Sequence, residues 1–315
     1  MNRRLSVAVT SAVFLALGIT PNAQRAGGAP GAPAAPPLVR ENVTEKISEH
    51  VYVIPDNSVS MVPNIGIIVG SRGTFVVDTG LGNRNGQTVT REMQKVSMTP
   101  ELYLGTTHFH PEHDLGANGF PPNTKMVRSQ DQQKEIAEQG MATAERFRGF
   151  SPANAELLQG AEFRKADISF DREHVVDLGG GVRVRVLAMG YNHTRGDTAF
   201  YVEPDGVLFS GDVVMTALPN VGNATVRQWL ASMNAFEKLQ PKRIVPSHGP
   251  MGDAGLIATY KTLLTTVSSR ASELKKQGRS LEEATATITA ELQAKYPNGG
   301  ARLTSTIRAA YTEAP

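Results

Sequence analysis

Hydrophobic and polar positions form short runs along the first half of the chain, and turn residues separate these runs. β-Branched and aromatic residues fill the runs, as is typical of strands. We predict strands at residues 51–54, 64–69, 74–77 and 102–107. Residues 86–98 have the spacing of a helix instead, so this half mixes strands and helices.

The second half repeats the strand pattern and then becomes helical. Further strands are predicted at residues 174–177, 182–187, 198–202, 207–210 and 243–246. Helices are predicted at 129–148, after the start signal Ser151–Pro152, at 225–239 and across 252–312, where Ser280 begins a capping sequence. In both halves a strand, a tight turn and a second strand end in an aspartate, Asp78 or Asp212, which suggests a weak internal duplication.

The N-terminus has the pattern of an exported protein. Arg3 and Arg4 precede an apolar run at 5–19 that is too short and too weakly hydrophobic to favour a membrane span. Residues 27–37 are almost entirely Ala, Gly and Pro. We therefore expect a signal peptide at 1–26, a linker at 27–41 and a domain at 42–315, of which 252–315 is helical. The mature protein is expected in the periplasm or secreted, with no membrane anchor after signal cleavage.

Composition excludes several classes of function. A formal net charge of +2 without a basic stripe argues against nucleic acid as a partner and leaves a small-molecule substrate. Cysteine is absent, so disulfides, thiolate metal sites and cysteine nucleophiles are excluded. The chain also lacks the Gly-x-Ser-x-Gly pattern of a serine nucleophile. Any metal ion must be bound by His, Asp and Glu.

The segment at residues 106–114 concentrates such ligands. Three of the seven histidines, His108, His110 and His113, fall within six residues, and Glu112 lies between the last two. Imidazole nitrogens and carboxylate oxygens are the ligands of zinc-like ions. The His-x-His spacing places two side chains on the same side of an extended segment. This segment therefore predicts a metal-binding loop.

Four further residues follow predicted strands: Asp78, His193, Asp212 and His248. A single histidine in a loop is more often a surface residue than a ligand, and Asp before Gly is common in turns. Loops at strand ends over a sheet nevertheless commonly build functional sites, so these residues join the candidate set.

Five segments in this order resemble the metallo-β-lactamase superfamily. They are residues 75–80, 108–113, 190–194, 210–212 and 246–249, and the resemblance covers about residues 45–250. It implies an α/β fold of the αββα type, a four-layer sandwich with helices outside two mixed sheets. The extra C-terminal helices would be added to this sandwich.

The resemblance also implies a role for each candidate residue. The first metal ion would bind three imidazoles, those of His108, His110 and His193. The second would bind Glu112, His113 and His248. Asp212 would bridge the two ions, and Asp78 would hold the ligands in place without touching metal.

Two features depart from the family pattern. The family's His-x-His-x-Asp-His has aspartate where this chain has Glu112, and the extra methylene either reaches the second ion by another rotamer or weakens its binding. Asp114 is interpreted as a turn residue that points elsewhere. The antibiotic-hydrolysing branch with a cysteine ligand has that cysteine at the position of Asp212 and a lysine at that of Met215, so this chain is not a standard member of that branch.

The expected cofactor is zinc, as one or two ions, with iron or manganese as alternatives. Zinc lowers the pKa of bound water to near seven, so a zinc-bound hydroxide would cleave an ester, thioester, lactone or amide, with Glu112 or Asp212 carrying the proton. Three alternatives remain: a β-lactamase or lactone-cleaving enzyme, a mononuclear iron dioxygenase acting on a persulfide, and a non-catalytic metal-binding protein.

Two other features are less specific. Trp229, the only tryptophan, lies in a predicted helix and is expected in the core. Residues 129–165 form either a helical lid over the site or a solvated surface excursion.

Overall fold

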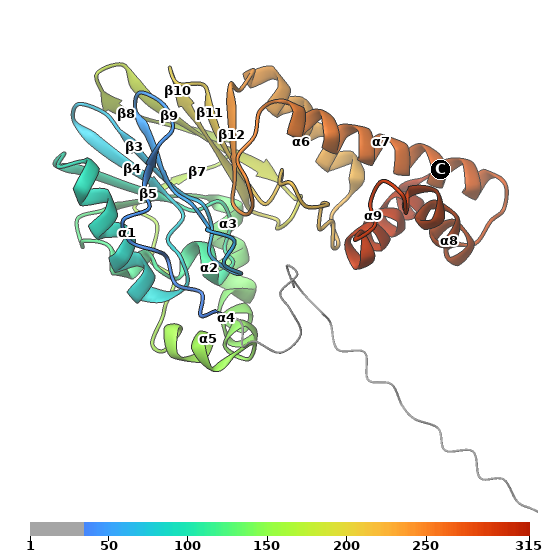
Figure 1. Cartoon of the computed structure of the whole chain (residues 1–315), viewed down its shortest axis with the longest axis horizontal. Helices are drawn as coiled ribbons and strands as arrows, with labels where there is room; N and C mark the ends of the chain where they lie inside the picture. Colours follow the sequence, from blue (N-terminus) through green and yellow to red (C-terminus); the bar gives the residue numbers. More distant parts are fainter. Residues whose placement is uncertain (1–34) are drawn as a thin grey trace, which may run out of the picture. The chain divides into compact units, whose positions relative to one another are not determined.

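Two β-sheets form the centre of the structure, and helices cover their outer faces (Figure 1). The computed structural model describes residues 35–315. The predicted signal peptide and residues 27–34 of the predicted linker lie outside the described residues. Pro37 and Val39, at the end of the predicted linker, bond through their backbones to the Asn85 side chain. The arrangement is the αββα sandwich expected from the sequence.

The first sheet has seven strands in the order of the chain. They are β1 (Glu45–Lys46), β2 (Val51–Ile54), β3 (Ile65–Val69), β4 (Gly73–Val77), β5 (Glu101–Gly105), β6 (Lys125–Ser129) and β7 (Ile168–Phe170). Strands β1 to β4 pair antiparallel, and β4 to β7 pair parallel. The sequence did not predict β1, β6 and β7, because they are short and lack a run of β-branched residues.

The second sheet has five strands in the order β12-β11-β10-β9-β8. They are β8 (Glu173–Gly179), β9 (Val182–Gly190), β10 (Asp197–Glu203), β11 (Val207–Gly211) and β12 (Arg243–Pro246). All pairs are antiparallel except β11 with β12. The parallel pair is important for the site, because the carboxyl ends of β11 and β12 then lie at the same edge.

The core between the sheets consists largely of valine and phenylalanine side chains. The rings of Phe75 and Phe200 meet across it at 5.4 Å. Glycine is required where these rings approach the opposite sheet: a Cβ on Gly105 would lie 2.5 Å from Phe200, and one on Gly66 would lie 2.4 Å from Phe209. Either side chain would force the sheets apart, so the two glycines set their separation.

Helices form the two outer layers. Helix α1 (Gly82–Val96) packs against the first sheet through Val89 and Met93. Helix α6 (Val226–Leu239) covers the second sheet, and α7 (Gly255–Lys276) packs against α6. Helices α8 (Leu281–Leu292) and α9 (Gly300–Glu313) pack against α7, beyond the sheet (Figure 1). Trp229 is fully buried in this layer, as expected, and Ser280 forms the predicted capping box of α8.

The helix predicted at 129–148 is divided in the structure. It consists of α3 (Gln130–Glu135), a π-helical turn η2 (Ile136–Gly140) and α4 (Met141–Arg148). Helix α5 (Pro152–Leu157) follows and begins at its predicted cap, Ser151. Two further short turns, α2 (Pro111–Asp114) and η1 (Ala117–Gly119), lie after β5.

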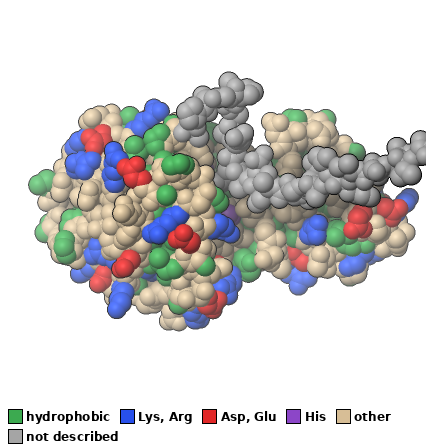
Figure 2. All heavy atoms as spheres, turned by 90° about the horizontal axis from the view of Figure 1, so that it is seen from below, with side chains coloured by type: hydrophobic (Ala, Val, Ile, Leu, Met, Phe, Trp, Pro, Cys, Tyr) green, Lys and Arg blue, Asp and Glu red, His purple; other side chains and the backbone are tan. Residues whose placement is uncertain are grey.

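The surface shows no concentration of one charge on the face drawn in Figure 2, where basic and acidic side chains are interspersed. Between residues 35 and 315, no helix combines the length and the apolar character that crossing a membrane requires.

Candidate metal centre

The predicted site residues come together at one edge of the two sheets. Asp78 follows β4 and the histidine loop follows β5, and these two strands are parallel neighbours. From the second sheet, His193 follows β9, Asp212 follows β11 and His248 follows β12. The structure thus brings into one cluster residues that the sequence spreads over 171 positions, from Asp78 to His248.

Three imidazoles form the first part of the cluster. His108 Nε2 lies 3.0 Å from His110 Nδ1, and His193 Nε2 lies 3.3 Å from the same His110 atom. One nitrogen from each ring falls within 4.8 Å of the others. Three nitrogens at this spacing can bind one metal ion.

The second part consists of Glu112, His113 and His248, whose ligand atoms also lie within 4.8 Å of one another. Glu112 Oε1 is 3.8 Å from His113 Nε2. The other ring nitrogens are already bonded: His113 Nδ1 lies 2.9 Å from Asp78, and His248 Nδ1 lies 3.0 Å from the carbonyl oxygen of Val62. The longer glutamate therefore does reach the position shared by the two histidines.

Asp212 lies between the two parts. Its Oδ2 is 3.5 Å from His193 Nε2, and its Oδ1 is 4.0 Å from His248 Nε2. It also groups with His108 and His113 within 4.8 Å. A carboxylate with one oxygen toward each group can bridge two cations.

Several of these atoms are buried without any hydrogen-bond partner among the described residues. They are Glu112 Oε2, His113 Nε2, Asp212 Oδ1 and His248 Nε2. A buried polar atom without a partner destabilises the fold by about 1–3 kcal/mol, so four of them in one cluster need a ligand. Two carboxylates and imidazole nitrogens are a donor set for zinc-like cations, and the residues present therefore fit a metal centre.

The electrostatics favour the cation-binding state of Asp212, His108 and His110. Burial raises the pKa of Asp212, but the surrounding imidazoles, His248 first, lower it to about 2. Burial and the neighbouring histidines hold the pKa of His108 and of His110 well below the usual value. These two imidazoles are therefore neutral and Asp212 is ionised at neutral pH. Burial raises the pKa of Glu112 to about 7.

Asp78 holds the histidine loop from behind. It accepts hydrogen bonds from the Thr107 backbone N–H at 2.7 Å and from the Thr107 hydroxyl at 3.0 Å. It also accepts from His113 Nδ1, and from the Ser247 hydroxyl at 3.3 Å. Burial lowers the pKa of His113, but the Asp78 carboxylate raises it to about 9. The backbone φ of Asp78 is 67°, in the left-handed region.

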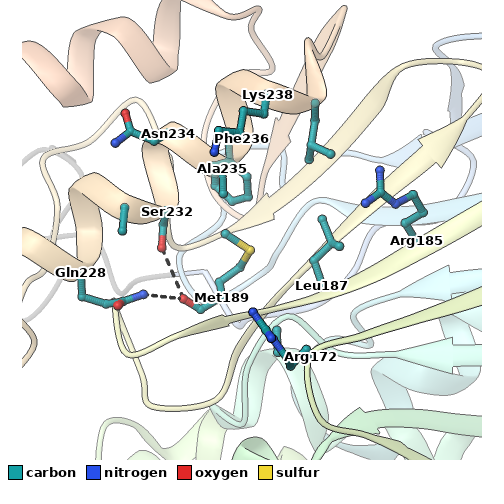
Figure 3. A pocket seen from close by; sticks show the side chains of 13 residues that line it. Arg172, Arg185, Leu187, Met189, Gln228, Ser232, Asn234, Ala235, Phe236 and Lys238 are labelled. Atoms are coloured by element: carbon teal, nitrogen blue, oxygen red, sulfur yellow. Dashed lines mark hydrogen bonds between the residues drawn. The ribbon is translucent and has the colours of Figure 1, made fainter.

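The His193 loop is held by groups that the sequence did not identify. Asp197 accepts from the backbone N–H of His193 at 2.6 Å and from the Thr194 hydroxyl at 2.7 Å. Before the loop, the Met189 carbonyl accepts from Gln228 at 2.9 Å and from Ser232 at 3.3 Å (Figure 3). An aspartate four residues after the histidine, next to glycine, was a signal for such a turn.

A cavity of about 410 Å³ lies beyond Met189, between β9 and α6 (Figure 3). Its lining includes Arg172, Arg185 and Lys238, and it contains none of the predicted metal ligands. The cavity is therefore separate from the candidate centre.

Asp114 corrects one prediction. It does face away from the metal-ligand atoms, but it is not a turn residue on an extended segment. Residues 111–114 form the short helix α2, with Pro111 at its start, and Asp114 is fully buried at its end. There it bonds to Arg128 and to Thr106.

The segment 129–165 borders the site. The ring of Phe147 in α4 lies 5.7 Å from that of His110. Phe147 packs in a small apolar cluster with Leu81 and Leu115, on the two sides of the histidine loop in the sequence. The segment is thus packed beside the first group of imidazoles and is not a solvated excursion at this point.

Comparison with known proteins agrees with this fold. The sequence model of the metallo-beta-lactamase superfamily matches residues 61–248, more than half of the chain. The structure is similar to the stereoselective inverting sec-alkylsulfatase Pisa1 from Pseudomonas sp., with a TM-score of 0.68 and 16% identity over 85% of this chain. The match covers 49% of the alkylsulfatase, so the chain spans about half of its length.

Two other solved structures are matched over most of their own length. A beta-lactamase domain protein from Burkholderia ambifaria matches with a TM-score of 0.58 and 18% identity, covering 84% of this chain and 87% of that one. A metallo-beta-lactamase from Pontibacter korlensis matches with a TM-score of 0.56 and 20% identity, covering 70% and 98%. No curated protein matches the sequence significantly. The family match, supported by the fold, shows that the chain belongs to the metallo-β-lactamase superfamily.

Proposed function

We propose that the protein is an exported metal-dependent hydrolase that cleaves an ester, thioester, lactone or amide of a small molecule. The main support is the convergence of two ligand groups on Asp212, with four buried polar atoms that have no partner among the described residues. Zinc is the proposed metal, as one or two ions, with iron and manganese as alternatives.

Each group has a proposed role in holding the metal ions. His108, His110 and His193 would hold one ion, and Glu112, His113 and His248 would hold the other. Asp212 would contact both. Bound zinc would polarise the scissile group and lower the pKa of water to near seven.

The chain's own carboxylates would move the proton. Glu112 Oε2 and Asp212 Oδ1 are the two carboxylate oxygens in the cluster without a partner among the described residues. Either carboxylate would accept a proton at such an oxygen and return it to the leaving group. Asp78 would keep His113 in one orientation, since its carboxylate accepts from Nδ1 and leaves Nε2 toward the metal.

Sulfate esters are a second candidate substrate. The match to the alkylsulfatase covers 85% of this chain, beyond the 61–248 range of the family model. Antibiotic hydrolysis of the kind performed by the cysteine-ligand branch has less support, because Asp212 replaces that cysteine and Met215 is buried and uncharged where the branch has lysine.

The test begins with metal content by elemental analysis of the purified mature protein, Glu112→Asp and Glu112→Gln. We expect two zinc ions in the parent and one in Glu112→Gln. His174→Ala is the matched control, because His174 lies outside the cluster, and it should keep both ions. One ion in the parent and two in Glu112→Asp would mean that glutamate keeps the site mononuclear, and a single iron would favour dioxygenase chemistry.

Activity is then measured on a panel of carboxyl esters, thioesters, lactones, β-lactams, amides and alkyl sulfates. We expect turnover of at least one class, and a loss of about 10²-fold or more in Asp212→Asn, as for removal of a catalytic acid or base. A folded, fully metal-loaded protein that hydrolyses no member of the panel would contradict the proposal and would favour a metal-binding protein without catalysis.

A further inference from the structure

A buried ion pair lies directly behind the histidine loop. Arg128 in β6 donates from one terminal nitrogen to both carboxylate oxygens of Asp114, at 2.9 and 2.7 Å. Asp114 is 0% exposed and Arg128 is 2% exposed. Neither residue belongs to the two groups of metal ligands.

Asp114 connects the two ends of the histidine loop. The Thr106 hydroxyl donates to Asp114 Oδ2 at 2.7 Å, which joins the first and last residues of the segment 106–114. Between these two residues lie four of the proposed ligands, His108, His110, Glu112 and His113. Gln132 holds the same closure from outside, since its amide donates to the Thr106 hydroxyl at 3.0 Å.

Arg128 anchors this closed loop to the first sheet. Its other terminal nitrogen donates to the carbonyl of Arg164 at 2.6 Å. Arg164 in turn donates to the carbonyls of Pro122 and Thr124, at 2.9 and 2.6 Å, just before β6 begins. The end of α2 is therefore fixed to a strand next to β5, which delivers the loop.

Stability alone does not account for such a pair. Removing two charges from water costs about as much as their attraction returns, and apolar residues of similar volume often serve equally well. A buried, charge-assisted contact in which one guanidinium nitrogen bonds to both carboxylate oxygens does hold the two groups at a fixed distance. Glu112 and His113 lie on the same short helix as Asp114, so this orientation sets where their ligand atoms lie.

We propose that Asp114 and Arg128 are positioning residues for the metal centre: their ion pair holds α2 so that Glu112 and His113 meet His248 at the second metal. This inference rests on the metal centre of the proposed function. The positions of the first group of imidazoles depend less on this ion pair, because His193 comes from the other sheet and His110 precedes α2.

Stepwise Zn²⁺ binding, measured by competition with a chromophoric chelator, tests the inference. His248→Ala identifies the binding step of the second group, and His110→Ala that of the first. In Asp114→Asn we expect the second step to weaken by about 10-fold or more, within the range for groups that orient ligands, and the first step to change by less than about threefold.

A double variant separates positioning from folding. Asp114→Leu combined with Arg128→Met replaces the pair by apolar side chains, so the metal-free protein should recover most of its melting temperature relative to Asp114→Asn. The second binding step should stay weak, because the closure through Thr106 is still lost. Glu92→Gln is the control, since Glu92 is another buried carboxylate in an ion pair, with Lys95, and its other partners, Asn42 and Thr44, are not ligand residues. This variant should bind Zn²⁺ as the parent does.

Two results would overturn the inference. One is an unchanged second step in Asp114→Asn, and the other is full recovery of that step in the double variant. A parent that binds no Zn²⁺ at all would instead refute the proposed metal centre, so the two failures are distinguishable.

Discussion

Asp78 is the residue whose replacement gives the sharpest test of how the centre is held together. Its carboxylate accepts from Thr107 twice, at 2.7 and 3.0 Å, from His113 at 2.9 Å and from Ser247 at 3.3 Å. These donors come from the histidine loop and from the loop after β12. Removing the carboxylate therefore breaks hydrogen bonds to loops from both sheets that build the site.

The expected loss can be estimated for two replacements. In Asp78→Ala the donors lose a buried charged acceptor, which costs about 3–5 kcal/mol, as for breaking a buried pair. Alanine at a left-handed φ adds about 1–2 kcal/mol. In Asp78→Asn the backbone conformation is tolerated and one oxygen still accepts. The amide NH₂ of the asparagine then faces at least one donor, and the free energy of unfolding falls by about 2 kcal/mol. Domains of this kind are stable by only about 5–15 kcal/mol, so both effects are measurable.

The assay is urea unfolding of the metal-free protein at neutral pH, followed by far-ultraviolet circular dichroism. Asn57→Ala serves as control for the backbone term, because Asn57 also has a positive φ, 50°, but bonds only locally to the Pro55 carbonyl. We expect the order of stability to be parent, Asn57→Ala, Asp78→Asn, Asp78→Ala. If Asp78→Ala lay within about 1 kcal/mol of the parent, the four hydrogen bonds would not be worth the energy assigned to them here.

Three further predictions concern the scaffold. Burial raises the pKa of Glu92, but hydrogen bonding, led by that from Lys95, brings the pKa below 4.5. The ionised Glu92 therefore stabilises the fold above pH 4.5, and this stabilisation is lost as pH falls through the folded-state pKa. In Glu92→Gln, urea midpoints should therefore fall less steeply on acidification, and a slope equal to the parent's would refute this. Trp229→Phe should cost about 2 kcal/mol in urea unfolding, because it removes the 2.9 Å bond to the Val213 carbonyl and leaves a void; no loss would contradict that bond. Ser280→Ala should cost about 1 kcal/mol by the same assay, and an unchanged midpoint would show that the capping box of α8 is unimportant.

Local features of the chain were predictable because their causes are local. β-Branched runs between turn residues located nine strands, since alternation and turn chemistry act over a few neighbours. Ser151 and Ser280 marked helix starts because a hydroxyl caps the N–H groups that follow it directly. The histidine loop stood out because its ligands are adjacent in sequence, although Pro111 begins a helical turn there and not an extended segment.

Only the tertiary structure decided how distant residues combine. Strand β6 carries Lys125 and Arg128, so its sequence did not indicate a strand; it forms because β5 and β7 pair on its two sides. The ion pair between Arg128 and Asp114 could not be predicted either, because it depends on where β6 lies relative to α2. From the sequence, Asp114 could only be interpreted as a polar turn residue. Its role follows from the fold, which buries it at the end of α2 and places the Arg128 guanidinium of β6 at 2.7 Å. Short-range patterns specify elements and candidate ligands, whereas burial and pairing across the fold specify which polar groups hold them in place.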